Sequence, residues 1–293
     1  MIDLHTHTTA SDGRCTPAEL VARAAANGVT VLSVTDHDTV AGCAGVRHEC
    51  DSRGIEFVPG IEITAVGEGR DVHVLGYFID VGSQPLQEFL AVQRERRIDR
   101  LRAMLDRLAA SGVPLDADAI LAPALQDPSR AAGRPWIARE LVRVGHVTSL
   151  AEAFEKWLAT GRPAFVPRMG APPSEVFERI HEAGGIASLA HPGLLARDQW
   201  IPGMASNGLD ALEAYHTKHT AADTERYLAM ASELDLAVSG GSDFHADDAH
   251  TAAAPGAVSL APSAFEALKA AHHRRRGRRA TSRPTASGSP TSS

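Results

Sequence analysis

The sequence predicts an α/β fold in which short buried strands alternate with helices. Three observations predict it. Short apolar runs, such as residues 30–35 (TVLSVT), recur in both halves of the chain and have the continuous apolar character of buried parallel strands. Helix start signals follow several of them, as at Thr16-Pro17, where a capping side chain precedes proline at the first helical position. Residues 84–168 break the alternation, because apolar residues recur there at helical spacing.

The first 83 residues are expected to form four strands and two helices. One helix begins at Thr16 and the other ends near Gly54. The third strand delivers Glu62 shortly after its end, and the fourth carries His73 within it. The expected strands are residues 2–7, 30–35, 55–58 and 71–78.

The alternation resumes after the middle of the chain, with a helix over residues 173–183. His191, His216 and the segment containing Asp243 and His245 each follow a short apolar run. Polar, metal-capable residues thus gather after strand ends, the edge on which parallel α/β barrels build their active sites. The expected strands here are residues 186–190, 209–215 and 236–239.

Residues 84–168 are predicted to be a helical insertion that caps the barrel mouth and shapes the substrate pocket. Further helices are expected over residues 136–144 and 150–158. The charged run at residues 94–102 is interpreted as a solvated helix face. Residues 272–293, a basic cluster followed by a Ser/Thr/Pro-rich stretch, are expected to be a disordered tail that either solubilises the protein or contacts RNA.

The composition is that of an ordinary globular protein, with 293 residues, 44% hydrophobic and 22% charged. No apolar run is long enough to cross a bilayer and the chain begins directly with strand sequence, so we expect a cytoplasmic location without membrane contact. Cys15, Cys43 and Cys50 are odd in number and lack a CxxC spacing, which predicts reduced thiols. A net charge of -7 argues against general attraction to nucleic acid.

Nine residues form the predicted metal-ligand set, and none of them is cysteine. Such a set suits Mn²⁺, Fe²⁺ or Zn²⁺ and exceeds the needs of one ion, so two or three ions are expected. Adjacent ions clamp a phosphoryl group and lower the pKa of a shared water, which predicts attack of metal-bound hydroxide on a phosphate ester. Asp36 and Asp38 are expected to orient the imidazole between them. Four histidines without a strand-end context are expected to be ordinary core or surface residues: His48, His146, His181 and His250. The ligand set is His5, His7, Asp12, His37, Glu62, His73, His191, Asp243 and His245.

The ordered motifs resemble those of the polymerase-and-histidinol-phosphatase (PHP) family of metal-dependent phosphoesterases, from the N-terminus to about Ala271. The similarity is greatest to the branch that hydrolyses nucleoside 3′,5′-bisphosphates such as pAp and acts as a 5′-to-3′ exonuclease on short RNA or DNA. This resemblance implies a distorted (β/α)₇ barrel in two parts, residues 1–83 and 169–271, around the helical insertion. It also implies three divalent ions, Mn²⁺ first. The motifs are HTH at residues 5–7, SDG at 11–13, TDHD at 35–38, GIE at 60–62, HVLG at 73–76, HP at 191–192 and GSDFH at 241–245.

Two further segments resemble family segments that contain catalytic residues. Residues 133–139 (GRPWIAR) resemble a family segment whose first arginine binds the reacting phosphate, which implies that role for Arg134. Trp136 stands where relatives often have histidine, and it either stacks on a base or packs. Residues 213–219 resemble a segment that faces the phosphate, so His216 or His219 is expected to donate a proton or to bind phosphate.

Three function classes are weighed. The resemblance favours a monomeric phosphoesterase acting on small nucleotides and short single-stranded oligonucleotides, with histidinol phosphate as another substrate. An amidohydrolase-like enzyme that cleaves C–N bonds is the alternative, although no bridging lysine is evident at a strand end. A metal-binding regulatory protein without turnover is the third.

Overall fold

A single seven-stranded sheet organises the chain. The computed structural model describes residues 1–246 and 254–282. The strands follow each other in chain order across the sheet, and all neighbours are parallel except β3–β4 and β4–β5. The strands are β1 (Ile2–Asp3), β2 (Val31–Val34), β3 (Glu56–Gly67), β4 (Arg70–Tyr77), β5 (Ile186–Leu189), β6 (Ala211–His216) and β7 (Ala237–Gly241).

The two outer strands approach each other and nearly close the sheet into a barrel. The amide of Leu4 donates to the carbonyl of Gly240 at 3.2 Å, and the amide of Asp243 donates to the carbonyl of His5 at 2.8 Å. The first and last parts of the sheet thereby bring the segments after β1 and β7 together. The predicted α/β class and distorted (β/α)₇ barrel are confirmed.

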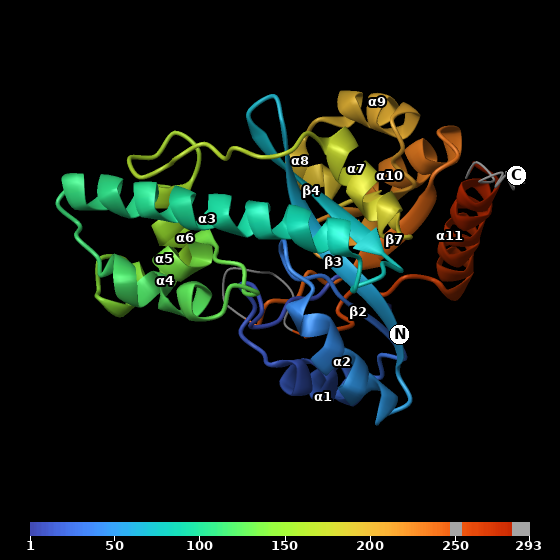
Figure 1. The fold of residues 1–293 in the computed structure, drawn as a ribbon, viewed down its shortest axis with the longest axis horizontal. Helices are drawn as coiled ribbons and strands as arrows, with labels where there is room; N and C mark the ends of the chain where they lie inside the picture. The colour runs from blue at the N-terminus through green and yellow to red at the C-terminus, as the bar shows by residue number, and fades with distance from the viewer. Residues whose placement is uncertain (247–253, 283–293) are drawn as a thin grey trace, which may run out of the picture.

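Helices between the strands cover the outside of the barrel, as Figure 1 shows. Two of them begin with capping boxes, Thr16 with Glu19 and Thr220 with Asp223, which satisfy backbone amides that the first helical turn leaves unpaired. None of the described helices is long and apolar enough to cross a membrane. The covering helices are α1 (Pro17–Ala26), α2 (Ala41–Asp51), α7 (Pro173–Glu182), α8 (Pro192–Leu195), η2 (Asp198–Trp200), α9 (Ile201–Ser206), α10 (Ala221–Glu233) and α11 (Pro262–Ser282).

The middle of the chain is entirely helical or irregular. Its long helix α3 projects from the barrel, and the shorter helices lie beside its outer half in Figure 1. These helices share a core of their own that includes Leu105, Ile137 and Leu158. The helices predicted at 136–144 and 150–158 are both present, the second as one α turn continued by a π turn. The elements are α3 (Gln84–Ala110), α4 (Ala117–Gln126), α5 (Arg134–Arg143), α6 (Leu150–Ala153) and η1 (Phe154–Leu158).

The third strand is longer than predicted, and Glu62 lies inside it rather than after its end. Gly60 looked like a strand end in the sequence, but the strand continues through it and pairs antiparallel with β4, placing Glu62 opposite Leu75. A Cβ on Gly60 would lie 2.3 Å from the Ser33 hydroxyl. Glycine is therefore needed here for close packing of neighbouring strands, not for a turn.

Two other expectations about charged segments are wrong. The run at residues 94–102 is not a uniformly solvated face, because Arg97 and Arg100 are buried against acidic partners. The chain also stays ordered past residue 271, since α11 runs to Ser282 and Arg275 binds Asp210 with an Nε to Oδ1 distance of 2.7 Å. The polar end of α11 is held because Arg275 pairs with Asp210 and because the apolar face of the helix packs on the core through Phe265 and Leu268. Residues 283–293 of the expected tail lie outside the described part.

Candidate active site

All nine predicted ligands come together at one end of the barrel. Most of them lie in loops after strands. Glu62 lies within β3, opposite Leu75, and His73 lies within β4, opposite Thr64. Their ligand-type atoms form overlapping groups in which every atom lies within 4.8 Å of the others. The groups that consist only of predicted ligands are His7, Asp12, His37 and His245; His5, His191 and Asp243; His5, His7 and Glu62; and His37, Glu62 and His73.

The Glu62 carboxylate is the centre of the cluster. Its Oε2 lies 3.0 Å from His37 Nδ1, 3.3 Å from His7 Nε2 and 3.4 Å from His5 Nε2. Its Oε1 lies 2.7 Å from His73 Nδ1 and 3.2 Å from His191 Nε2. A carboxylate with both oxygens turned to different histidine sets has the arrangement of a bridging ligand.

Asp243 and Asp12 complete the cluster on its other sides. Asp243 Oδ1 lies 3.3 Å from both His5 Nε2 and His7 Nε2. Asp12 Oδ1 lies 3.3 Å from His245 Nε2, and its Oδ2 lies 3.7 Å from the Nε2 of His37. The Asp243 backbone has a φ of +53°, a left-handed conformation that non-glycine residues adopt rarely and that is concentrated at functional sites.

The side chains present fit divalent cations. Several ligand-type atoms are buried without a hydrogen-bond partner, an arrangement that is costly unless something else binds there. Burial raises the pKa of Glu62, but His37 and His73 outweigh it and hold the carboxyl well below its usual range. Burial lowers the pKa of His37 to about 4. Burial lowers the pKa of His7 too, but Asp243 and Glu62 outweigh it and raise the value to about 10, so a cation that binds at His7 would displace a proton. Among the described residues, the unpartnered atoms include His5 Nε2, both ring nitrogens of His7, His37 Nδ1 and Glu62 Oε2.

Glu213, which the sequence analysis did not select, orients two of the ligands. Its Oε1 accepts from His5 Nδ1 at 2.8 Å, and its Oε2 accepts from the His191 amide at 2.6 Å. With the proton held on Nδ1, the His5 Nε2 lone pair faces the cluster, the usual role of a carboxylate behind a metal-binding histidine. Asp3 similarly binds the Ser242 amide and hydroxyl at 2.9 and 2.7 Å. Both are charged residues inside apolar strands, a signal that was available in the sequence.

Asp36 and Asp38 do not bind the His37 imidazole, so that expectation is wrong. Asp36 accepts from the Thr8 amide at 2.8 Å and from the Ser11 hydroxyl at 2.7 Å, which fixes the loop that presents Asp12. Asp38 accepts from Arg97 Nε at 2.5 Å and from the Thr64 amide. Each aspartate therefore ties one segment of the site to the next rather than setting the orientation of a ligand ring.

The structure distinguishes the two histidines that follow β6. His216 Nδ1 accepts from the Lys218 amide at 3.2 Å, which leaves the proton on Nε2, 3.4 Å from Asp243 Oδ2. His219 donates from Nδ1 to the Ala214 carbonyl at 2.9 Å and accepts at Nε2 from the Gly193 amide at 3.2 Å. The backbone thus occupies both nitrogens of His219, whereas the protonated nitrogen of His216 faces the cluster.

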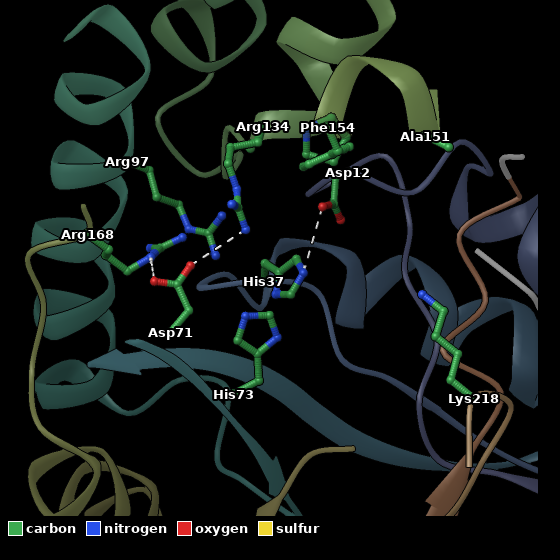
Figure 2. A pocket seen from close by; sticks show the side chains of 12 residues that line it. Asp12, His37, Asp71, His73, Arg97, Arg134, Ala151, Phe154, Arg168 and Lys218 are labelled. Atoms are coloured by element: carbon green, nitrogen blue, oxygen red, sulfur yellow. Dashed lines mark ion pairs between the residues drawn. The ribbon is translucent and has the colours of Figure 1, made fainter. Parts of the chain in front are cut away.

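A cavity of about 360 Å³ opens above the cluster and is strongly cationic on one side. Figure 2 shows Arg97, Arg134 and Arg168 gathered around Asp71, with His37 and His73 below them. Trp136 does not line this cavity; its Nε1 donates to the Ser11 carbonyl at 3.3 Å and its ring is buried, so the packing alternative holds for this residue. The residues lining the cavity are Asp12, His37, Asp71, His73, Arg97, Gly133, Arg134, Pro135, Ala151, Phe154, Arg168 and Lys218.

Comparisons with known proteins show which family this chain resembles in sequence and fold. The model of the PHP domain matches residues 3–155. The 5′-3′ exoribonuclease Rnm of Escherichia coli is 36% identical over 255 residues, which are 83% of this chain and 84% of the relative. The 3′,5′-nucleoside bisphosphate phosphatase of Chromobacterium violaceum is 34% identical, with 84% and 87% covered. A solved structure from Bifidobacterium adolescentis, assigned to the metal-dependent phosphoesterases, superposes with a TM-score of 0.84 at 30% identity, covering 92% of this chain and 95% of that one.

Proposed function

Because the chain belongs to the PHP-domain family, we propose that it hydrolyses phosphate esters of nucleoside 3′,5′-bisphosphates and, as a 5′-to-3′ exonuclease, those at the 5′ ends of short oligonucleotides. It is a metal-dependent phosphoesterase, a hydrolase that acts on phosphate esters. One observation supports the nucleotide substrate above others: the cavity that opens on His37 and His73 is lined on one side by arginines, which suits a polyanion. The site is complete within one chain, and we propose the monomer as the active unit.

The proposed cofactors are three divalent ions, Mn²⁺ first, with Fe²⁺ or Zn²⁺ as alternatives. The short contacts of Glu62 and Asp243 support dividing the ligands into three sets. When bound, such ions polarise the phosphoryl group and activate water at neutral pH. The proposed sets are His5, His7, Glu62 and Asp243; Glu62, His73 and His191; and Asp12, His37 and His245.

Arg134 is the proposed binder of the reacting phosphate. It lies at the start of α5, lines the cavity and is 28% exposed at its side chain. Its guanidinium pairs with Asp71 only at 3.7 Å, so its donors remain available to an incoming anion. A guanidinium at this position stabilises the negative charge that grows on the phosphoryl oxygens.

His216 is the proposed proton donor to the leaving oxygen. The Lys218 amide fixes the tautomer that carries the proton on Nε2, and this nitrogen faces the ligand cluster. We exclude His219 from catalysis, because its two ring nitrogens hold the Gly193 and Ala214 backbone in place.

A substrate panel tests the proposal. Purified protein is assayed under Mn²⁺ for phosphate release from adenosine 3′,5′-bisphosphate, histidinol phosphate and an aryl phosphate, and for release of phosphate or 5′-mononucleotides from 5′-phosphorylated short RNA. We expect the nucleotides to have the highest kcat/KM and inorganic phosphate to inhibit. A preference for histidinol phosphate would reassign the substrate class. If the protein hydrolyses none of these phosphate esters but does hydrolyse C–N bonds, the amidohydrolase alternative is favoured. If it has neither activity, a regulatory protein is favoured.

A further inference from the structure

Three guanidinium groups share one carboxylate at the arginine-lined side of the cavity. Asp71 Oδ2 lies 3.5 Å from Arg100 Nη1 and 3.7 Å from Arg134 Nη2, and Asp71 Oδ1 lies 3.6 Å from Arg168 Nε. Asp38, the neighbouring carboxylate, pairs with Arg97 and at 3.7 Å with Arg168. Four arginines thus face two carboxylates, which leaves an excess of positive charge in a largely buried place.

Among the described residues, Arg168 makes no hydrogen bond in this group, whereas each of the three guanidinium nitrogens of Arg97 donates one. The Arg97 guanidinium donates to Asp38, to the Ala132 carbonyl and to the Thr64 hydroxyl. Arg168 has only the two long ion pairs and no hydrogen bond among the described residues, and its Nε is buried without a partner. Its side chain is 11% exposed. Native structures rarely leave a buried cationic donor in this state unless a ligand binds it.

The surroundings of Arg168 favour a phosphate group as that ligand. A planar guanidinium with free N–H groups binds phosphate oxygens through two parallel hydrogen bonds. Burial lowers the pKa of Arg168 to about 9, and a bound dianion would offset this cost of desolvation. The same cavity is lined by His37 and His73, so a phosphate at Arg168 would belong to the molecule that reacts at the cluster. The cavity volume is within the range of small-molecule sites.

We propose that Arg168, flanked by Arg97, forms a subsite for the second, non-reacting phosphate of the substrate. The proposal rests on the proposed function, because it assigns the reacting phosphate to the ligand cluster. Asp71 acts as the internal counter-ion that keeps the guanidiniums in place when no substrate is bound. The chemistry fits either the terminal monoester of a bisphosphonucleotide or the next phosphodiester of an oligonucleotide. In the view of Figure 2, this subsite and Lys218 lie on opposite sides of His37 and His73.

Substrates with one and two phosphates test the subsite. We would measure kcat/KM under Mn²⁺ for adenosine 3′,5′-bisphosphate, 3′-AMP and 5′-AMP with the wild type and Arg168→Gln. We expect kcat/KM of the variant to fall about 10- to 100-fold for the bisphosphate, mainly through a higher KM. For whichever of 3′-AMP and 5′-AMP the wild type hydrolyses, kcat/KM should fall less than about threefold. Arg168→Lys, which keeps the charge but not the planar fork, should lose less. Arg162→Gln, an exposed arginine on the same connecting segment, is the matched control and should change neither value.

The outcome that overturns the subsite is an equal loss on one and two phosphates, or no loss on either. A 5′-phosphorylated dinucleotide distinguishes the two sources by its product. If the wild type releases inorganic phosphate from it, a loss in Arg168→Gln assigns the subsite to the internal phosphodiester; if the wild type releases the 5′-mononucleotide, a loss assigns the subsite to the terminal monoester. If Arg168→Gln does not fold, as judged by circular dichroism, Arg168→Lys carries the test with a smaller expected loss.

Binding separates this proposal from the proposed function. Calorimetric titration of the protein without added metal with adenosine 3′,5′-bisphosphate and 5′-AMP needs no turnover. We expect tighter binding of the bisphosphate to the wild type and loss of this preference in Arg168→Gln. If the enzyme hydrolyses none of these compounds, the proposed substrate class fails, and the binding preference alone then supports or overturns the subsite.

Discussion

Replacing Glu213 by glutamine should weaken metal binding without removing any ligand. The carboxylate accepts two hydrogen bonds in a fully buried position, one from the His5 ring and one from the His191 amide. Glutamine keeps the shape of the side chain and loses its charge, and its amide group can satisfy only one of the two donors. The His5 proton is then no longer held on Nδ1, and the lone pair on Nε2 is lost to the site in part of the molecules.

The magnitude follows from the role of carboxylates behind metal-bound histidines. Their removal lowers metal affinity about 10- to 100-fold, which corresponds to roughly 1.4 to 2.8 kcal/mol. The assay is calorimetric titration of metal-stripped protein with Mn²⁺, together with elemental analysis after dialysis. Glu233→Gln, an exposed glutamate on α10, is the control. An Mn²⁺ affinity equal to that of the wild type would refute the argument that Glu213 sets the tautomer of His5.

Four further predictions concern the ions, the phosphate and the C-terminal helix. Elemental analysis of Mn²⁺-loaded protein should give about three ions per chain, and Asp12→Asn should empty only one of them, because the imidazoles nearest to its carboxylate, His245 at 3.3 Å and His37 at 3.7 Å, belong to one proposed set; loss of all metal would contradict this grouping. Arg134→Ala should raise the barrier for ester hydrolysis by about 2 to 4 kcal/mol while metal content stays unchanged, and loss of metal would point to a structural role. Deleting residues 272–293 should lower Tm, because it removes the ion pair of Arg275 with Asp210, whereas deleting residues 283–293 should not; equal Tm values for both truncations would refute the docking of α11. Burial raises the pKa of Asp210, but His181 and backbone bonding outweigh it and lower the value. Its stabilising effect should therefore be present above about pH 4 and be lost as the pH falls through the lowered pKa, and acid unfolding curves of Asp210→Asn that match the wild type would contradict this.

The sequence was sufficient for the fold class and for the set of ligand-type residues that converge. Motif spacing placed His5 and His7 on one face of an extended segment and His191 and His245 after strands, and these are local properties. The position of Glu62 within a strand could not be predicted from the sequence. A glycine such as Gly60 that permits close packing of strands looks the same in the sequence as a glycine that ends a strand.

Residues that act across long sequence separations were harder to predict. Glu213 supports His5 across the whole barrel, and Arg168 meets Asp38 only after the insertion has folded back on it. Arg97 and Arg100 belong to a charged run whose composition is that of a solvent-exposed helix, and only the position of α3 against the cavity buries them. The outcome for α11 is of the same kind, since the ion pair with Asp210 is visible only in three dimensions.

The closure of the barrel by residues 4–7 against residues 240–244 sets an order of events during biosynthesis. His5 and His7 are synthesised well before Asp243 and His245, their partners in the cluster. A chain elongates at about 5–20 residues per second, so the first histidines wait for many seconds without the carboxylate that completes their site. The full set of nine proposed ligands therefore exists only after His245 has been made, and a product truncated before Asp243 lacks two of them however much of the barrel it contains.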